Sequence, residues 1–196
     1  MATIINASTS AGLIQTADTS GTLQLQSNGV TQQTIDSTGS YGQLARGTAV
    51  ASTSGTAIDF TSIPSWVKRI TVMFNGVSTS GTSNYLVRIG SGSVDTTGYS
   101  SSGLTQNSSG GLTAPSDSTG FITLAPQTAA SACSGAMTIL NVSGNIWVSS
   151  GAVSGGVYGQ VSGGTKTLAG TLDRVRITTV NGTDTFDAGS INILYE

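Results

Sequence analysis

Residues 65–77 read SWVKRITVMFNGV and carry the clearest secondary-structure signal in the chain. Apolar side chains recur at alternate positions along this stretch, as they do in a β-strand that buries one face. The predicted apolar face holds Trp66, Ile70, Val72 and Phe74, and the opposite face holds Val67, Arg69, Thr71 and Met73. The stretch therefore predicts a half-buried strand, with Trp66 in the core or at a subunit interface.

The segment after this strand is open to two interpretations. The Asn75–Gly76 pair is compatible with a bulge, and STSGTS (78–83) is equally compatible with a turn. In either case we expect NYLVRIG (84–90) to pair back as the next strand, with Tyr85, Val87 and Ile89 on one face.

The composition of the whole chain favours strands over helices. Its 196 residues include 27 glycines, only 8% are charged, and the single glutamate is Glu196. Strong helix formers are therefore scarce, and no window keeps a 3.6-residue apolar period. Hydrophobic residues make up 37% of the chain, which is more than disordered segments contain. We expect an ordered, all-β protein.

Residues 47–196 carry the longer strand signals and form the predicted C-terminal domain. Ser143–Gly144 and Asn181–Gly182 are predicted hairpin turns, whereas 91–120 shows no sustained alternation and is predicted to be a surface loop system with at most a short strand at Val94. About eight to ten strands result, which is typical of an antiparallel β-sandwich or jelly roll.

Residues 1–46 differ from the rest. The stretch SAGLIQTADTSGTLQLQSNGVTQQTIDSTGSYG (10–42) repeats short apolar segments separated by turn residues. Strands are expected near Ile4, at Leu13, at Leu23 and Leu25, and at the end of VTQQTI (30–35). A ribbon of two or three such strands is barely stable alone in water. We therefore expect other copies of the chain to cover the apolar residues, making 1–46 a stalk for attachment and trimerisation.

Charge and residue usage exclude several functions. The net charge is −2 and no run of Lys or Arg is present, so neither nucleic acid nor an anionic membrane is an expected partner. The first residues, MATIINAST, lack a basic n-region and no stretch approaches 18 apolar residues, so we expect neither a signal peptide nor membrane insertion. Cys133 is the single cysteine and is expected to be a small buried apolar residue.

The absence of histidine removes Ser–His and Cys–His catalysis and histidine-ligated metals. A glycosidase needs only two carboxylates, and Asp95 with Asp117 is the pair considered. Both aspartates stand among turn residues, which favours a structural role. Asp184 and Asp187 could offer oxygen ligands to Ca²⁺, but the EF-hand spacing is missing. We expect no enzyme, no cofactor and no metal site.

Three segments carry a resemblance to a known class of proteins. TSGTLQLQSNGVTQQTIDSTG (19–39) resembles a segment of many tailed-phage fibre and virion structural proteins. SGTAIDFTSIPSWVKRITVMFNGVSTSG (54–81) and AGSINILYE (188–196) are similar to a C-terminal module common in phage genomes. The resemblance implies a homotrimeric virion protein, made in the host cytoplasm and displayed on the particle exterior, whose residues 1–46 contact tail, baseplate or capsid proteins.

Two functions within this class remain open. One is a short tail fibre or tip adhesin that binds a host surface glycan or protein through several weak loop contacts; the other is a capsid decoration or head-fibre protein with no receptor role. The candidate receptor contacts are aromatic residues near polar turns, because aromatic rings stack on sugars. They are Tyr99, expected to be exposed, Trp147, which also fits the core, and Tyr158.

Overall fold

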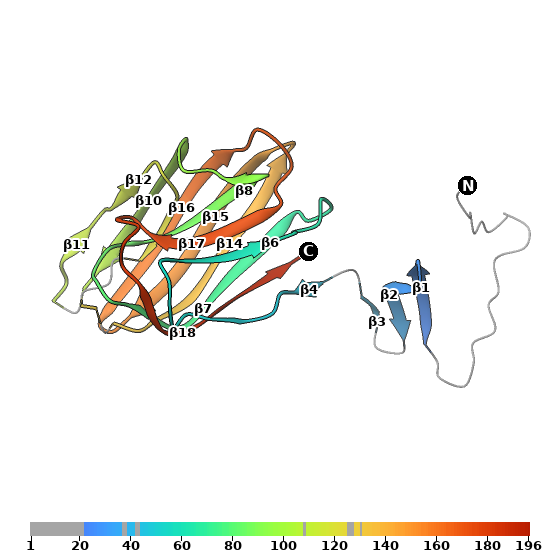
Figure 1. The fold of residues 1–196 in the computed structure, drawn as a ribbon, viewed down its shortest axis with the longest axis horizontal. Helices are drawn as coiled ribbons and strands as arrows, with labels where there is room; N and C mark the ends of the chain where they lie inside the picture. The colour runs from blue at the N-terminus through green and yellow to red at the C-terminus, as the bar shows by residue number, and fades with distance from the viewer. Residues whose placement is uncertain (1–21, 37–38, 42–43, 108, 125–127, 130) are drawn as a thin grey trace, which may run out of the picture. The chain divides into compact units, whose positions relative to one another are not determined.

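The computed structural model describes residues 22–36, 39–41, 44–107, 109–124, 128–129 and 131–196 (Figure 1). The chain forms two compact units, Met1–Leu44 and Ala45–Glu196. We predicted the boundary after residue 46. Ala45 and Arg46 form a short strand that pairs with Tyr195 and Leu194 and so belong to the second unit. The described residues contain no helix, so the all-β prediction is confirmed.

The first unit contains a three-stranded antiparallel sheet of β1 (Leu23–Ser27), β2 (Val30–Asp36) and β3 (Gly39–Tyr41). Asn28 and Gly29 connect β1 to β2 with φ angles of 52° and 76°, because tight hairpin turns need positive φ at both central residues. The strands expected at Leu23 and at 30–35 are confirmed, whereas those near Ile4 and Leu13 lie outside the described residues.

The second unit is a β-sandwich of two antiparallel sheets (Figure 1). In order across the large sheet, the strands are β11 (Leu112–Thr113), β10 (Tyr99–Gln106), β16 (Tyr158–Thr167), β15 (Ile146–Gly155), β14 (Cys133–Ser143), β7 (Arg69–Thr79), β18 (Phe186–Tyr195) and β4 (Ala45–Arg46), with β12 (Ser116–Asp117) beside β10 and β5 (Val50–Ala51) beside β18. In the small sheet they are β13 (Phe121–Leu124), β8 (Tyr85–Ser91), β17 (Arg174–Thr179) and β6 (Ala57–Thr61), with β9 (Ser93–Val94) beside β8.

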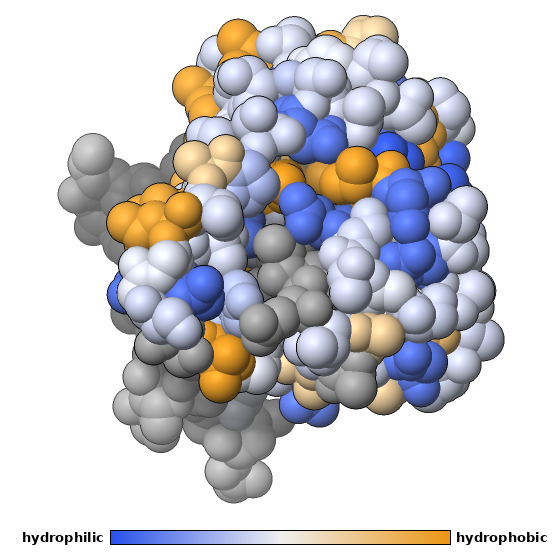
Figure 2. Space-filling view, turned by 90° about the vertical axis from the view of Figure 1, so that its left-hand side faces the viewer, coloured by the Kyte–Doolittle hydropathy of each residue, from blue (hydrophilic) through white to orange (hydrophobic). Residues whose placement is uncertain are grey.

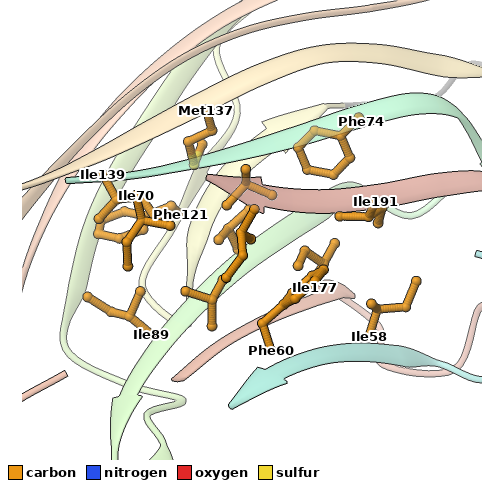
Figure 3. Packing of buried hydrophobic residues seen from close by; sticks show 14 of the residues in the cluster. Ile58, Phe60, Ile70, Phe74, Ile89, Phe121, Met137, Ile139, Ile177 and Ile191 are labelled. Atoms are coloured by element: carbon orange, nitrogen blue, oxygen red, sulfur yellow. The ribbon is translucent and has the colours of Figure 1, made fainter. Parts of the chain in front are cut away.

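The hydrophobic core lies between the two sheets (Figure 3). Ile70, Val72 and Phe74 of β7 are buried, as predicted. They meet apolar residues of the small sheet such as Phe60 and Ile177. The alternation that predicted these strands thus arises because each sheet packs one face against the other.

The predicted strand at 65–77 begins later than expected. Trp66 lies in a turn before β7, is 39% exposed and packs its ring against Tyr195 at a centroid distance of 5.9 Å. Val67, predicted to face away from the core, is buried instead. The pattern failed here because these two residues precede the strand, so the two-residue period does not apply to them.

Two predicted pairings are wrong. NYLVRIG forms β8, but β8 pairs with β13 and β17 in the small sheet and not with β7. The turn at Asn181–Gly182 exists, yet it joins β17 in the small sheet to β18 in the large sheet. In both places the chain crosses between sheets, because Tyr85 and Ile177 must bury against the core from the opposite side. The β14–β15 hairpin is confirmed, but its central residues are Gly144 and Asn145, one position later than the predicted Ser143–Gly144 pair.

Residues 91–120 are more ordered than predicted. They contain the eight-residue strand β10 as well as β9, β11 and β12. The missed strand reads YSSSGLTQ, with burial at Tyr99, Ser101 and Thr105. Its inward residues are mostly small and polar, so the apolar alternation that reveals a half-buried strand is absent.

The bulge interpretation of Asn75–Gly76 is confirmed. β7 continues through this pair to Thr79, and its register shifts against both β14 and β18. Gly76 and the facing Gly189 have φ angles of 62° and 88°. A Cβ on Gly189 would collide with the Gly76 carbonyl oxygen, whereas a Cβ on Gly76 would meet nothing within 4 Å.

This difference predicts unequal costs for two alanine substitutions. Gly76→Ala should lower the free energy of unfolding by about 1–2 kcal/mol through its positive φ alone. Gly189→Ala should cost at least about 1 kcal/mol more, because the backbone must also move. Urea unfolding of both variants measures the difference, and equal values would show that the close approach is not a constraint.

Candidate functional site

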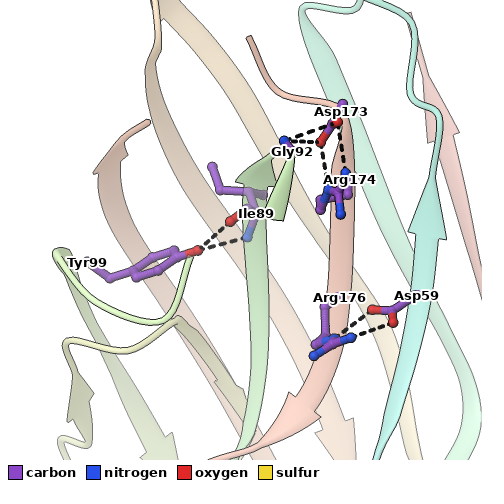
Figure 4. A network of polar contacts seen from close by, with 7 residues as sticks. All are labelled: Asp59, Ile89, Gly92, Tyr99, Asp173, Arg174 and Arg176. Carbon is purple, nitrogen blue, oxygen red and sulfur yellow. Dashed lines mark hydrogen bonds and ion pairs between the residues drawn. The ribbon is translucent and has the colours of Figure 1, made fainter. Parts of the chain in front are cut away.

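Tyr99 joins the two sheets and is buried, contrary to the exposure that we expected (Figure 4). It extends from β10 of the large sheet to Ile89 on β8 of the small sheet. Its hydroxyl oxygen accepts a hydrogen bond from the Ile89 N–H at 2.8 Å and lies 3.0 Å from the Ile89 carbonyl oxygen, to which it can donate. Burial raises the pKa of Tyr99 well above its ordinary value. The side chain thus replaces a neighbouring strand for Ile89.

Lys166 lies beside Tyr99 on the inner face of the large sheet. Its ammonium group is 2.8 Å from Asp95 Oδ2, donates to the Thr97 carbonyl oxygen at 2.8 Å and lies 5.1 Å from the centre of the Tyr99 ring. A buried ammonium needs such partners to offset its desolvation. Asp95 therefore balances the charge of Lys166 and holds the loop before β10.

The other acidic residues considered for chemistry also have structural partners. Asp117 Oδ1 accepts hydrogen bonds from the Thr119 N–H at 2.5 Å and the Thr119 hydroxyl at 2.6 Å. Asp184 accepts from the Ser83 N–H at 3.0 Å, and Asp187 accepts from the Ser78 hydroxyl. Within the described part of the chain, no group of three metal-ligating side chains converges.

The three aromatic candidates do not form one exposed patch. Trp147 is buried and sits next to Lys166 in the register of β15 and β16, as Tyr99 sits next to Lys166 on the other side. Tyr158 is half-buried at the start of β16, beside the exposed turn residue Val157. Of the three, Tyr158 is the one that a receptor could contact without unfolding the sandwich.

The outer face of the small sheet carries charged side chains in pairs (Figure 4). Arg176 binds both carboxylate oxygens of Asp59 at 2.6–2.7 Å, and Arg174 binds those of Asp173 at 2.7–3.0 Å. The hydrogen bonds from Arg174 lower the pKa of the Asp173 carboxyl below its ordinary value. All four side chains are partly exposed, which is typical of a face that meets solvent.

The outer face of the large sheet is almost uncharged. Across β10, β16, β15, β14 and β7, the outward side chains are Ser, Thr, Gly, Ala, Val, Ile, Leu, Met, Gln and Asn, apart from Arg69 at one end, which pairs with Glu196. Sequence reasoning missed this face. The signal that could have revealed it is strand alternation, which places Lys166, the other charged residue of these strands, on the inward side.

A shallow groove of about 640 Å³ opens on this face near the β11 end of the sandwich. Leu104, Val157 and Val161 line it together with polar groups such as Gln106 and Ser154. These three apolar residues are 45–57% exposed. Figure 2 faces this end of the sandwich and shows apolar side chains exposed among hydrophilic ones. The residues that line the groove include no acidic and no basic side chain.

Comparisons with protein-family models, with curated proteins and with solved structures found no match to this chain. Within the described residues, no helix that could cross a membrane is found.

The Tyr99 hydrogen bonds predict a specific loss of stability. Tyr99→Phe leaves the buried Ile89 N–H unpaired and should lower the free energy of unfolding by about 1–3 kcal/mol. The control Tyr158→Phe, at the half-exposed tip, should change it by less than about 0.5 kcal/mol. Urea unfolding measures both, and a neutral Tyr99→Phe would contradict the role given to the hydroxyl.

The buried thiol of Cys133 and the buried hydroxyl of Tyr85 predict a decline of stability at high pH. Burial raises the pKa of Cys133 from 9.0 to about 12 and that of Tyr85 from 10.0 to about 12. Above pH 9.0 the unfolded thiol loses its proton while the folded one keeps it. The contribution of the thiol to stability is therefore constant below that pH and falls above it, and the contribution of Tyr85 falls above pH 10.0, by up to about 1.4 kcal/mol per pH unit for each group.

Urea unfolding between about pH 8 and about pH 10 measures this decline, where the thiol dominates. The matched variant Cys133→Ala should show a shallower decline over the same range. Identical slopes for the variant and the unmodified chain would exclude the thiol as the cause.

Proposed function

We propose that the chain is a structural protein of a tailed-phage virion, most specifically a short tail fibre or tip adhesin. The supporting sequence features are the segments 19–39, 54–81 and 188–196. The arrangement described above fits binding better than catalysis, because the acidic side chains hold loops and partner cations. In this role the sandwich is displayed outward and residues 1–46 attach it to other virion proteins.

The observation that carries this proposal is the exposed apolar side of the β1–β2 hairpin. Leu23 faces Ile35 in register, and Leu25 follows two residues along. These three side chains remain 37–39% exposed. Two further copies of the chain would cover them, which supports a homotrimeric stalk.

Receptor binding in this proposal takes place at the β11 end. The exposed Val157 and the half-buried Tyr158 stand there at the β15–β16 turn, and a host surface glycan or protein is the expected ligand. Three weak sites on one fibre, with several fibres per particle, raise avidity by about 10²–10⁴ if they engage together.

The location of the protein on the particle tests the proposal. Imaging of particles that carry the labelled chain should place it at the tail in a few dozen copies or fewer. Hundreds of copies on the capsid lattice would overturn the fibre proposal and favour a capsid decoration or head-fibre protein.

The hairpin predicts an assembly defect. Leu25→Asp should reduce incorporation into particles severalfold, because it places a carboxylate on the surface that neighbouring copies cover. Gln24→Asp on the same strand adds the same charge to the opposite side and should be tolerated. Quantitative immunoblotting of purified particles compares them, and equal incorporation would refute the role of the apolar side.

Deleting residues 1–44 separates folding from attachment. The remaining unit keeps β4 and its pairing with β18, so it should fold with a cooperative thermal transition and yet be absent from particles. Normal incorporation of the truncated protein would show that attachment does not depend on the first unit.

A further inference from the structure

The outer face of the large sheet differs from the outer face of the small sheet in a way that points to a partner. The small sheet displays Asp59, Asp173, Arg174 and Arg176 to solvent. The large sheet displays neutral side chains over five neighbouring strands, apart from Arg69 at one end. Depletion of charge is the compositional mark of the centre of a protein–protein interface.

The strand registers show how the apolar side chains of this face are arranged. One cross-strand row runs from β10 to β7 and consists of Leu104, Val161, Ala152, Ala136 and Met73. A parallel row nearer the other end consists of Ser100, Thr165, Val148, Leu140 and Arg69, so its apolar part is the pair Val148 and Leu140, the latter 42% exposed. Between them lies a row of small residues, Ser102, Gly163, Ser150, Thr138 and Thr71. The face therefore carries one apolar row and one shorter apolar pair, with a row of small residues between them.

The size of the face suits a stable contact. Five strands of about eight residues span roughly 24 Å by 27 Å, or about 650 Å², close to the roughly 800 Å² that each partner contributes to a standard interface. Leu104 and Val161 keep 45% and 57% of their surface exposed, so apolar area is still available for burial.

We propose that this face, formed by the outward residues of β10, β16, β15, β14 and β7, packs against a second copy of the same chain. Near the symmetry axis of a homo-oligomer, a charge on a shared face meets its own copies and is repelled by them. A face whose interior has no charge avoids this cost, whereas the paired arginines of the small sheet would have to be desolvated. This inference rests on one part of the proposed function, the association of several copies of the chain.

The contact also completes the groove. Leu104, Val161 and Ala152 line the groove and belong to the first apolar row. A second copy seated on this row would cover these residues and form the opposite wall of the groove.

A pair of matched charge variants of the full chain tests the contact. Val161→Glu places a carboxylate in the middle of the apolar row, and Thr61→Glu places the same charge on the exposed face of β6 in the small sheet. Analytical ultracentrifugation over a dilution series should show association weakened at least about tenfold for Val161→Glu and unchanged for Thr61→Glu. Thermal unfolding of both variants verifies that they fold, and Thr165→Glu on the same outer face replaces Val161→Glu if that variant does not.

The outcomes separate this inference from the proposed function. Association that survives both sheet variants but is lost in Leu25→Asp would overturn the sheet contact and leave the stalk proposal standing. A chain that is monomeric at every concentration would overturn the contact and the homotrimer together. Loss of association in Val161→Glu with normal tail location of the unmodified protein would support both.

Discussion

Hydrogen bonds between the two sheets are the contacts on which the sandwich depends at its β8 side. The Tyr99 hydroxyl pairs with the Ile89 backbone, Ser101 Oγ accepts from the Ile122 N–H at 2.9 Å, and the Tyr85 hydroxyl lies 3.4 Å from the Val77 carbonyl oxygen. The edge strand β13 has only four residues, too few to pair the whole of β8. At Ile89, the Tyr99 side chain from the large sheet therefore takes over the hydrogen bonding that a longer strand would supply, because buried backbone groups must be paired.

Alternation of apolar residues made the class of fold and several strands predictable. It located β14, β15 and the buried face of β7, and turn chemistry located the β14–β15 hairpin. It could not reveal which strands share a sheet, since a turn such as Asn181–Gly182 serves equally well between sheets. It also missed β10, because an inward face of Tyr99, Ser101 and Thr105 is stabilised by hydrogen bonds to particular partners. Such partners are defined only by the folded structure.

The candidate site shows the same limit. Sequence reasoning identified Tyr158 as a residue near an exposed turn. For Trp147 it left two positions open, a receptor contact or the core, and Trp147 is buried. The nearly uncharged outer face of the large sheet could not be predicted from the sequence, because recognising it requires knowing which strands lie side by side without charged residues. The scarcity of charge was visible in the composition, but the placement of Arg88, Arg174 and Arg176 on the small sheet follows from strand order, which alternation does not encode.

The path of residues 45–52 along β18 has a mechanical consequence. Arg46, Val50 and Ala51 pair with β18, and the Gly47 and Ser52 N–H groups donate to the carbonyl oxygens of Ile193 and Gly189. Tension entering the sandwich at Leu44 must break these contacts in sequence before it reaches β6. The last strand of the chain thus holds residues 45–52 against the large sheet, and these contacts resist a pull on the N-terminal side before β6 does.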